Sequence, residues 1–460
     1  MIQLNAKQSW AVVGGGLLGM TLALRLAQQG KQVTLFEAAP CLGGVAAAWR
    51  LGAVIWDRHY HVTLHSDLHL RALLRELGLE GELQWRTART GFYANSQLYS
   101  LSNAIDFLRF PPLNLFEKTR LALTILQASR IRDSTELERI SVEDWLTEWS
   151  GRGVTRKIWL PLLRAKLGDS YRDTSAAFIW ATIARMYSAR RTGAKTEMFG
   201  YVLGGYAQIL RAFEESLQRS QVRIRLAQPI RAIRPTCSGE LRVESNRAPS
   251  EDFSHVIVTA PAPLVAEMCP ALQNDEKNRL RGIKYQGLIC ASLLLKNPLS
   301  TFYITNIADT HAPFTAIIEM SALVDPSQFG GRSLVYLPKY VSPVSPDFAQ
   351  SYNQIRDKFL NSLEQMFPQF RRSDVECFQI SRVKHLLPIP TINYSTHIPP
   401  FSTSIPGLHI VNSAQIVNGT LNVNETVRLA ESAAQEFIDH FPVRHPIAAF
   451  LSHELAPTHS

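Results

Sequence analysis

Hydrophobic and polar positions divide the start of the chain into a strand, a helix and a second strand. The apolar run over residues 10–13 is typical of a parallel strand that is covered on both faces. An amphipathic pattern over residues 17–29 predicts a helix, and Gly30 is its expected end. Residues 32–36 predict a second strand, which ends in Glu37. This order predicts the beginning of a parallel α/β sheet.

Later parts of the chain alternate between helical and extended patterns. Leucines at helical spacing predict a helix over residues 66–79, which follows the typical N-cap residues Ser66 and Asp67. The other expected segments are a strand pair at 91–101, helices between 103 and 200, mostly β structure between 283 and 400, and strand–helix units at 200–265 and 407–438.

Composition narrows the class of protein. The 460 residues are enough for two or three domains, and 46% of them are hydrophobic. The five cysteines are scattered without a C-x-x-C pair, which argues against a disulfide framework and favours a reducing compartment. No basic run with an apolar core opens the chain, and no apolar segment reaches about 20 residues, so we expect a cytoplasmic protein without a membrane span.

The net charge of +9 is spread along the chain rather than gathered with aromatic residues. No nucleic-acid-binding motif is visible, so we expect no nucleic-acid partner. A solvated basic surface accounts for the charge. Attraction to an anionic lipid or to an anionic substrate is the alternative.

Three glycines stand where the first predicted strand passes into the helix, in a G-x-G-x-x-G motif. Gly14 permits a tight turn, Gly16 lets a pyrophosphate approach the positive helix end, and Gly19 lets the helix pack closely on the strand. Glu37 is placed to accept hydrogen bonds from both hydroxyls of an adenosine ribose. A glycine-rich turn in an unrelated α/β fold is the alternative. The predicted dinucleotide site contains Gly14, Gly16, Leu17, Leu18, Gly19, Glu37 and Ala38.

A second glycine pair follows the ribose acid within a few residues, in Leu42-Gly43-Gly44-Val45. Such a pair suits a long cofactor, because the backbone must leave room for a ribityl chain and a flavin ring. The arrangement resembles the FAD-binding start of the superfamily of flavin amine oxidases, protoporphyrinogen oxidases and phytoene desaturases. Its pattern is an acid, a few residues and then L-G-G, commonly followed by an arginine in place of Val45. The resemblance implies FAD as the cofactor, with Gly43, Gly44 and Val45 beside it.

Residues 57–61 read Asp-Arg-His-Tyr-His and resemble a D-x-G-x-H-like segment that passes beside the flavin ring in that superfamily. The resemblance places His59 next to the cofactor. It places Tyr60 and His61 on the flavin or substrate side, where they are the candidate catalytic residues. A buried loop with hydrogen-bonded histidines is the alternative interpretation. No acid or cysteine follows at ligand spacing, so no metal site is predicted.

Three later segments also resemble parts of this superfamily. Residues 159–168 resemble the W-x-P-L-L-x-x-K-x-G stretch of its helical domain. Gly204-Gly205 precedes the helix and strand that return the chain to the cofactor domain. Residues 407–438 resemble the last cofactor segment, where a helix directs its N-terminus at the flavin. The resemblance adds Ile230 at the adenine, and Ala260, Asn412, Leu421, Asn422 and Val423, to the FAD site; Thr420 belongs to the same loop.

The fold implied by the resemblance is α/β. It consists of a Rossmann-type FAD-binding domain, glutathione-reductase-like and of amine-oxidase type, with an interleaved α+β substrate domain. By position, Tyr303, Glu319 and Tyr336 are candidates for the substrate cavity, and a structural role is the alternative for each. The expected parts are a discontinuous FAD domain at 1–90, 200–265 and 400–440, a helical part at 91–199, a mixed β-sheet at 266–399 and a tail at 441–460.

The activity implied by the resemblance is that of an FAD-dependent oxidoreductase. The expected reaction transfers a hydride from a C–H or C–N bond of an apolar small molecule to flavin N5. No second G-x-G-x-x-G unit is visible, which favours oxygen or a quinone as electron acceptor. The alternative is a non-redox flavoenzyme related to UDP-galactopyranose mutase, with Arg185, Arg190 and Arg191 as candidate diphosphate ligands. A flavoprotein-fold binding or assembly factor without turnover is the third hypothesis.

The predicted helix within residues 114–132 has two interpretations. One face carries Leu115, Leu121, Leu123, Ile125 and Leu126, and basic residues stand at 118, 120, 130 and 132. Such a helix can cover the core of a helical substrate domain, or it can lie on a membrane surface. The sequence does not predict an oligomeric state.

Overall fold

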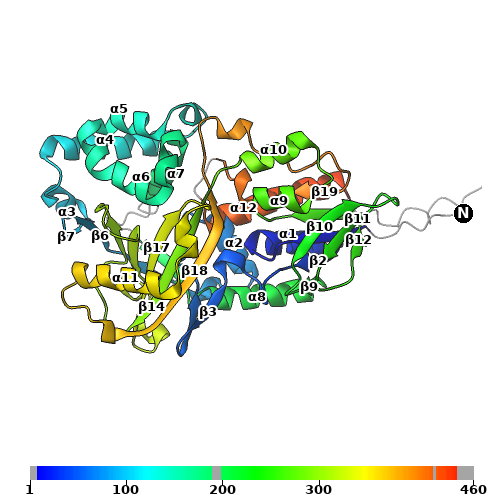
Figure 1. Cartoon of the computed structure of the whole chain (residues 1–460), viewed down its shortest axis with the longest axis horizontal. Coiled ribbons are helices and arrows are strands. Elements are labelled where there is room, and N and C mark those ends of the chain that lie inside the picture. Colours follow the sequence, from blue (N-terminus) through cyan, green and yellow to red (C-terminus); the bar gives the residue numbers. More distant parts are fainter. Residues whose placement is uncertain (1–7, 189–197, 418–420, 443–460) are drawn as a thin grey trace, which may run out of the picture.

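The computed structural model describes residues 8–188, 198–417 and 421–442. Figure 1 shows a lobe built on a parallel sheet at one end and, at the other, a mixed sheet with a group of helices above it. The predicted α/β fold with an interleaved α+β part is confirmed.

The first lobe is organised around a parallel sheet with the strand order β19-β13-β1-β2-β9. The strands come from three remote parts of the chain, as the sequence predicts. All their pairings are parallel, and β1 lies between β13 and β2. The strands are β1 Ser9–Val13, β2 Gln32–Phe36, β9 Arg223–Arg225, β13 His255–Val258 and β19 Leu408–Ile410.

Separate hydrophobic cores cover the two faces of this sheet. On one face α1 packs against α8 and α12, around Trp10, Met20 and Phe213. On the other face α9, α10 and a small antiparallel sheet pack around Phe253 and Cys269. Burial from both sides explains why these strands read as continuous apolar runs. The elements are α1 Leu17–Gln28, α8 Gly205–Arg219, α12 Val423–His440, β10 Ile230–Pro235, β11 Leu241–Ser245, β12 Glu251–Phe253, α9 Ala262–Met268 and α10 Asn274–Gly282.

The second lobe contains a mixed sheet with the order β18-β14-β17-β16-β15-β6-β7. Helix α11, Tyr352–Met366, covers one face of this sheet. Strands β6 and β7 join it through a parallel pairing with β15, so residues 90–100 belong to the mixed sheet and not, as predicted, to the helical part. The strands are β6 Thr90–Ala94, β7 Gln97–Ser100, β14 Tyr285–Leu295, β15 Ile304–Ile307, β16 Ala316–Glu319, β17 Ser333–Val341 and β18 Val375–Pro388.

The helical part lies above the mixed sheet and is shown in cyan to green in Figure 1. Side-chain caps begin three of its helices: Asn103 caps α3, Asn114 caps α4 and Ser141 caps α5. The helices are α3 Ala104–Arg109, α4 Leu115–Arg130, α5 Val142–Val154, α6 Leu160–Leu167 and α7 Ala176–Ser188.

Two short strand pairs and α2, Leu68–Glu76, connect the lobes. The sequence predicts that Ser66 or Asp67 caps α2, but Asp67 makes no side-chain capping bond there. Its carboxylate instead accepts from the amide of Leu64 and pairs with Arg185. The strand pairs are β3 Ala48–Leu51 with β4 Val54–Asp57, and β5 Leu83–Thr87 with β8 Met198–Val202.

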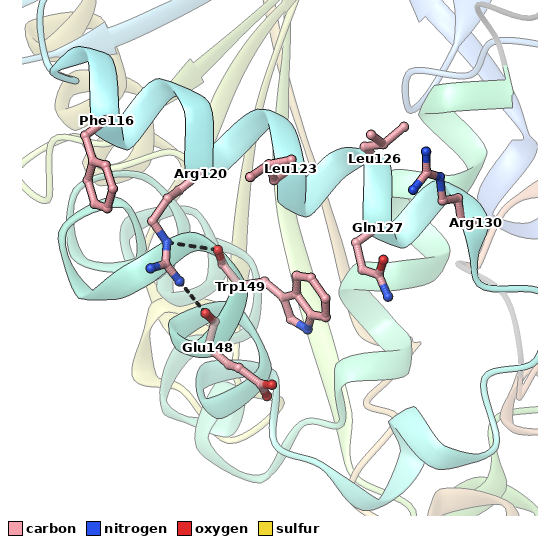
Figure 2. A pocket seen from close by; sticks show the side chains of 8 residues that line it. All are labelled: Phe116, Arg120, Leu123, Leu126, Gln127, Arg130, Glu148 and Trp149. Carbon is pink, nitrogen blue, oxygen red and sulfur yellow. Dashed lines mark hydrogen bonds between the residues drawn. The ribbon is translucent and has the colours of Figure 1, made fainter.

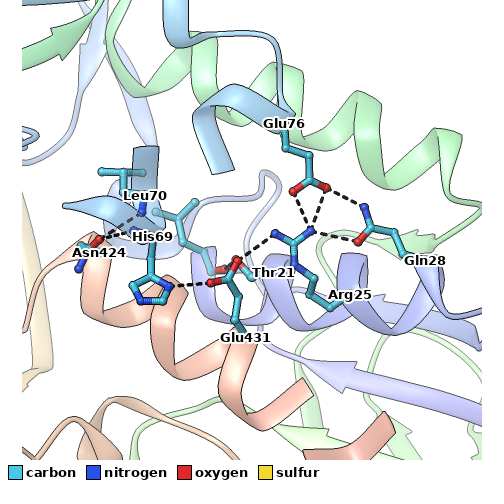
Figure 3. A network of polar contacts seen from close by, with 9 residues as sticks. Thr21, Arg25, Gln28, His69, Leu70, Glu76, Asn424 and Glu431 are labelled. Carbon is cyan, nitrogen blue, oxygen red and sulfur yellow. Dashed lines mark hydrogen bonds and ion pairs between the residues drawn. The ribbon is translucent and has the colours of Figure 1, made fainter. Parts of the chain in front are cut away.

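The cap of α2 comes from α12, far along the chain. Asn424 Oδ1 accepts from the amides of His69, at 2.9 Å, and Leu70, at 3.2 Å. Glu431 of the same helix pairs with Arg25 of α1 at 3.0 Å and with His69 at 2.8 Å. Figure 3 shows how these contacts join α1, α2 and α12. A polar residue at 424 is thus explained by helix capping.

We expect Asn424→Ala to lower the free energy of unfolding by about 2 kcal/mol, because it leaves two helix-terminal amides without their acceptor. Urea unfolding followed by circular dichroism measures the change. Gln435→Ala, on an exposed turn of the same helix, is the matched control and should change the stability by less than about 0.5 kcal/mol. Equal effects of the two substitutions would contradict the capping role.

Candidate functional site

The glycine turn after β1 has the geometry that the motif predicts. Gly14 has φ 118°, and its amide donates to the carbonyl of Phe36 at 2.8 Å. A Cβ at Gly19 would overlap the carbonyl oxygen of Gly14, so only glycine allows α1 to pack this closely. Gly16 is the N-cap of α1, which has no side-chain cap and no acidic residue in its first turn among the described residues. Leu17 and Leu18 therefore present backbone amides to an anion.

Glu37 is held in a fixed orientation at the end of β2. Its Oε2 accepts from the amide of Gly15 at 2.6 Å, and its Oε1 accepts from the amide of Ala39 at 2.8 Å. The neighbouring Ala38 is exposed. Because each carboxylate oxygen has further lone pairs, Glu37 can still accept hydrogen bonds from a ribose. The amide of Gln228 donates to the Glu37 carbonyl, which brings the segment before Ile230 alongside.

The second glycine pair lies directly against the first glycine turn. The amide of Gly43 donates to the carbonyl of Gly15 at 2.8 Å, and both glycines of the pair have positive φ. A Cβ at Gly44 would stand 3.1 Å from the Cα of Gly16. Val45 follows with an exposed side chain. The two glycine segments thus form one backbone cradle without side chains.

The carboxyl ends of the parallel strands place the predicted residues in one row. In strand order the row contains Asn412 after β19, Ala260 after β13, Gly14 after β1, Glu37 after β2 and Ile230 beyond β9. Neighbouring strands lie about 4.8 Å apart, so the five ends span about 19 Å. Ligands of open α/β sheets bind along this edge. The row suits an extended dinucleotide rather than a mononucleotide.

Asn412 provides an independent test of the fit to FAD. Its side chain is buried, and its Oδ1 accepts from the amide of Ala414 at 3.0 Å. Its Nδ2 group has no hydrogen-bond partner within the described part of the chain. A buried donor without an acceptor is costly, so this amide is suited to a phosphate or ribityl oxygen. Together with the uncapped helix and the glycine cradle, it shows that the site fits FAD.

The N-terminus of α12 supplies the last predicted segment. Asn422 is its N-cap and accepts from the amide of Glu425 at 3.1 Å, and Leu421 packs into the core of the helical part. Val423 opens the helix, whose positive end suits an electron-rich ring. Thr420, from the same predicted loop, lies outside the described residues.

His59 joins the glycine cradle to the mixed sheet. Its Nδ1 donates to the carbonyl of Val45 at 2.8 Å, and its Nε2 lies 3.0 Å from the hydroxyl of Ser381 on β18. Burial lowers the pKa of His59 to about 4, which keeps the ring neutral. This residue therefore positions the backbone beside the cofactor site.

Tyr60 and His61 follow at the junction of the two lobes. The Tyr60 hydroxyl lies 3.1 Å from that of Tyr340 on β17. His61 Nδ1 donates to the carbonyl of His59 at 2.9 Å, which leaves the Nε2 lone pair as an acceptor. Burial lowers the pKa of His61 to about 4. Both candidate catalytic residues thus directly follow His59, which contacts the segment after the second glycine pair, and their catalytic roles remain predictions.

The sequence patterns miss several residues near Tyr60 and His61. Lys166 of α6 has its Nζ 5.6 Å from the ring centroid of Phe178 and 5.9 Å from that of Tyr340. Burial, and then the charge of Arg185, lowers the pKa of Lys166. Its position in the W-x-P-L-L-x-x-K-x-G stretch is the signal that could have drawn attention to it. Arg185 pairs with Asp67 at 3.0 Å.

Asp57 is a second residue that the sequence patterns do not assign to the site, and it contacts α8. Its side chain is buried, and Oδ1 accepts from the amide of Tyr206 at 2.7 Å in the first turn of that helix. Burial raises the pKa of Asp57 to about 7. The Asp57 carbonyl also accepts from the Tyr336 hydroxyl. The aspartate of the D-x-G-x-H-like segment therefore connects β4 to α8 and to the mixed sheet.

The three cavity candidates are buried in the sheet. Glu319 accepts from the amides of Leu299 and Ser300, which fixes the turn before β15. Tyr303 and Tyr336 are almost completely covered by their neighbours. The structure thus supports the structural alternative for Glu319. The Tyr336 hydroxyl donates to the Asp57 carbonyl, so Tyr336 helps to hold the segment that leads to Tyr60 and His61.

Comparison with known proteins identifies the family. The family model for flavin-containing amine oxidoreductases matches residues 19–438, which run from the last glycine of the first motif through the second glycine pair to near the end of α12. The chain belongs to this family. This match confirms the predicted superfamily, and FAD as the cofactor is supported by the family and by the fit of the site.

Individual relatives are distant. A probable zeta-carotene desaturase from Synechococcus elongatus is 25% identical over 41% of this chain and 44% of its own length, so the match spans less than half of that relative. A putative protoporphyrinogen oxidase from Exiguobacterium sp. 255-15 is 19% identical with a TM-score of 0.75, covering 95% of this chain and 99% of its own. A reduced UDP-galactopyranose mutase is 13% identical with a TM-score of 0.71, covering 95% and 94%. These structures show a shared fold.

Proposed function

We propose that the protein is an FAD-dependent oxidoreductase that takes a hydride from a C–H or C–N bond of an apolar small molecule. The observation that carries the proposal is the row of strand ends that leads from Glu37 to Asn412 and suits an extended dinucleotide. When bound, FAD supplies the hydride acceptor at N5.

The proposed roles of this chain's residues follow from their contacts. The glycine cradle and Glu37 bind the nucleotide, and Asn412 donates to it through Nδ2. His61 Nε2 is held neutral and can accept a proton or a hydrogen bond from a substrate. Tyr60 and Tyr340 form an aromatic wall, which favours an apolar substrate and excludes water.

A mutase needs cations that bind the diphosphate of its substrate. The described residues around Tyr60 and His61 offer few of them. Arg185 is paired with Asp67. The pKa of Lys166 is lowered by burial. Arg190 and Arg191 lie outside the described residues. The pairing of Arg185 and the lowered pKa of Lys166 favour the oxidoreductase over the mutase.

Anaerobic mixing of the FAD-loaded protein with polyenes, porphyrinogens, amines and nucleotide sugars tests the proposal. We expect one of the electron-donating compounds to bleach the flavin absorbance, and air or a quinone to restore it. Isomerisation of a nucleotide sugar only after dithionite reduction would instead support the mutase. Binding of a compound without bleaching or turnover would support a non-catalytic factor.

The same assay addresses His61. We expect His61→Ala to retain FAD and to slow bleaching by about 10²-fold or more, within the range for a lost acid–base group. Because the pKa of His61 is near 4, its titration should not shape the rate above about pH 5. His65→Ala, whose ring stacks on Trp85 away from the cluster, is the control. Unchanged bleaching in His61→Ala would assign the ring a structural role.

A further inference from the structure

Helices α3 and α4 turn apolar side chains toward solvent. Leu115 and Phe116 are 73% and 70% exposed at the start of α4, and Leu123 is more than half exposed two turns later. Ile105 and Leu108 extend this surface onto α3. With Leu126, these are six of the thirteen large hydrophobic side chains that are exposed among the described residues. A gathering of this kind is unusual on a protein surface and marks an interaction site.

Helix α4 has a mixed inward face. The buried residues of this face are the apolar Leu121 and Ala128 and the polar Lys118 and Thr124. The Lys118 ammonium donates to the carbonyl of Leu108 at 2.6 Å, and the Thr124 hydroxyl lies 2.8 Å from that of Ser150. A helix that only covered a core would turn its leucines inward. Three of the five residues on the predicted core face, Leu115, Leu123 and Leu126, point outward instead, so folding alone does not explain them.

A groove of about 570 Å³ lies between the outer face of α4 and α5. Phe116, Leu123, Leu126 and Trp149 line it, as Figure 2 shows. The Arg120 guanidinium in the groove donates to the backbone carbonyls of Glu148 and Trp149, and Figure 2 marks both bonds. Gln127, Arg130 and Glu148 also line the groove, and the remaining lining is apolar.

Cations surround the apolar surface. Arg109 ends α3, Arg130 ends α4 and Arg132 follows, and all three side chains are exposed. None of the three has an acidic partner within the described ranges. The nearby Glu117 is paired with Lys157 at 2.8 Å. The surface therefore combines an apolar centre with a positive edge, on a chain whose net charge is +9.

We propose that the outer faces of α3 and α4 dock the protein on a phospholipid bilayer with anionic headgroups. Phe116 and Leu123 enter the boundary between headgroups and acyl chains, and the arginines lie at the level of the phosphates. α4 has 16 residues and is about 24 Å long, so it lies along the surface. No described helix is long and apolar enough to cross a bilayer.

Charge argues against a second copy of this chain as the partner. In a two-fold symmetric contact the same patch faces itself, so the positive edge formed by Arg109, Arg130 and Arg132 would face the same positive edge of the other copy. An anionic bilayer instead attracts them. This docking does not depend on the proposed reaction.

Sedimentation of the full-length protein with vesicles tests the proposal. We expect the protein to pellet with phosphatidylcholine vesicles that contain phosphatidylglycerol, and far less with phosphatidylcholine alone. The double variant Phe116→Ser/Leu123→Ser should bind at least about tenfold more weakly, because two exposed apolar anchors are lost. Ile55→Ser/Val344→Ser removes exposed apolar side chains elsewhere and is the matched control. Unchanged FAD absorbance verifies that each variant is folded.

The arginines are tested separately. Replacing Arg109, Arg130 and Arg132 by glutamine should weaken binding to anionic vesicles by about fivefold for each arginine, with little effect on neutral vesicles. The proposal is overturned if wild-type protein stays in the supernatant at low salt, or if the serine variant and its control bind equally. A dimer in light scattering that Phe116→Ser/Leu123→Ser dissociates would assign the surface to a second copy.

Discussion

Replacing Glu37 by alanine is expected to weaken FAD binding by about two orders of magnitude. The carboxylate is held by the amides of Gly15 and Ala39, so it meets the ribose without reorganisation. Hydrogen bonds from both ribose hydroxyls to a charged acceptor contribute about 3 kcal/mol, which corresponds to about 150-fold in affinity. Equilibrium titration of the cofactor-free protein, followed by quenching of FAD fluorescence, measures the change.

Two further measurements separate binding from folding in this experiment. Glu80→Ala removes an exposed carboxylate that pairs with Arg75 in the same lobe, and it should leave the FAD affinity unchanged. The free energy of unfolding of the cofactor-free Glu37→Ala variant shows how much stability is lost with the contacts to Gly15 and Ala39. An FAD affinity within about threefold of wild type, in a folded variant, would contradict the placement of the ribose.

Local patterns were sufficient to predict the part of the cofactor site that lies at the start of the chain. The G-x-G-x-x-G turn, Glu37 and the second glycine pair each follow from chain geometry within a few residues. Their positions in one row follow from the rule that parallel strands present their carboxyl ends at one edge. The burial of β13 and β19 also follows from their apolar composition. The remote residues Ile230, Ala260 and Asn412 were assigned to this site by the resemblance to the superfamily, and the strand order explains why they lie along the same edge.

Contacts between remote polar residues could not be predicted in the same way. Asn424 caps α2 across more than 350 positions, and His59 meets Ser381 across 322. Neither contact leaves a local pattern, because an asparagine or a serine suits many environments. Lys166 reaches the Tyr60–Tyr340 pair only through the packing of α6 on the mixed sheet. These residues decide how the site is held, and they become visible only in three dimensions.

Helix α4 illustrates a further limit. Leucines at helical spacing predict the helix correctly, but periodicity does not say which side of it faces the protein. The inward face is decided by polar partners, namely the Leu108 carbonyl for Lys118 and the Ser150 hydroxyl for Thr124. The interpretation of this helix as core cover was therefore wrong for Leu115, Leu123 and Leu126.

Replacing Glu319 by alanine is expected to lower the free energy of unfolding by about 3 kcal/mol or more. The carboxyl group is fully buried and accepts from the amides of Leu299 and Ser300, at 3.0 and 2.9 Å, and from the Ser333 hydroxyl at 2.8 Å. Alanine leaves a cavity and three donors without their acceptor. Glu319→Gln keeps one acceptor oxygen and nearly the same volume, so it should cost less.

The difference in free energy of unfolding between the wild type and Glu319→Gln is also expected to depend on pH. Burial raises the pKa of Glu319 from 4.5 to about 7, so the folded state binds this proton more tightly than the unfolded state. Protonation therefore stabilises the fold, and this contribution is complete below pH 4.5 and is lost as pH rises to about 7. Glutamine cannot titrate, whereas the buried histidines contribute equally to both proteins and cancel in the difference. Relative to Glu319→Gln, the wild type should gain up to about 3 kcal/mol between pH 7 and 4.5. Urea unfolding of both proteins at several pH values measures this gain, and a difference that does not change with pH would show that Glu319 remains ionised.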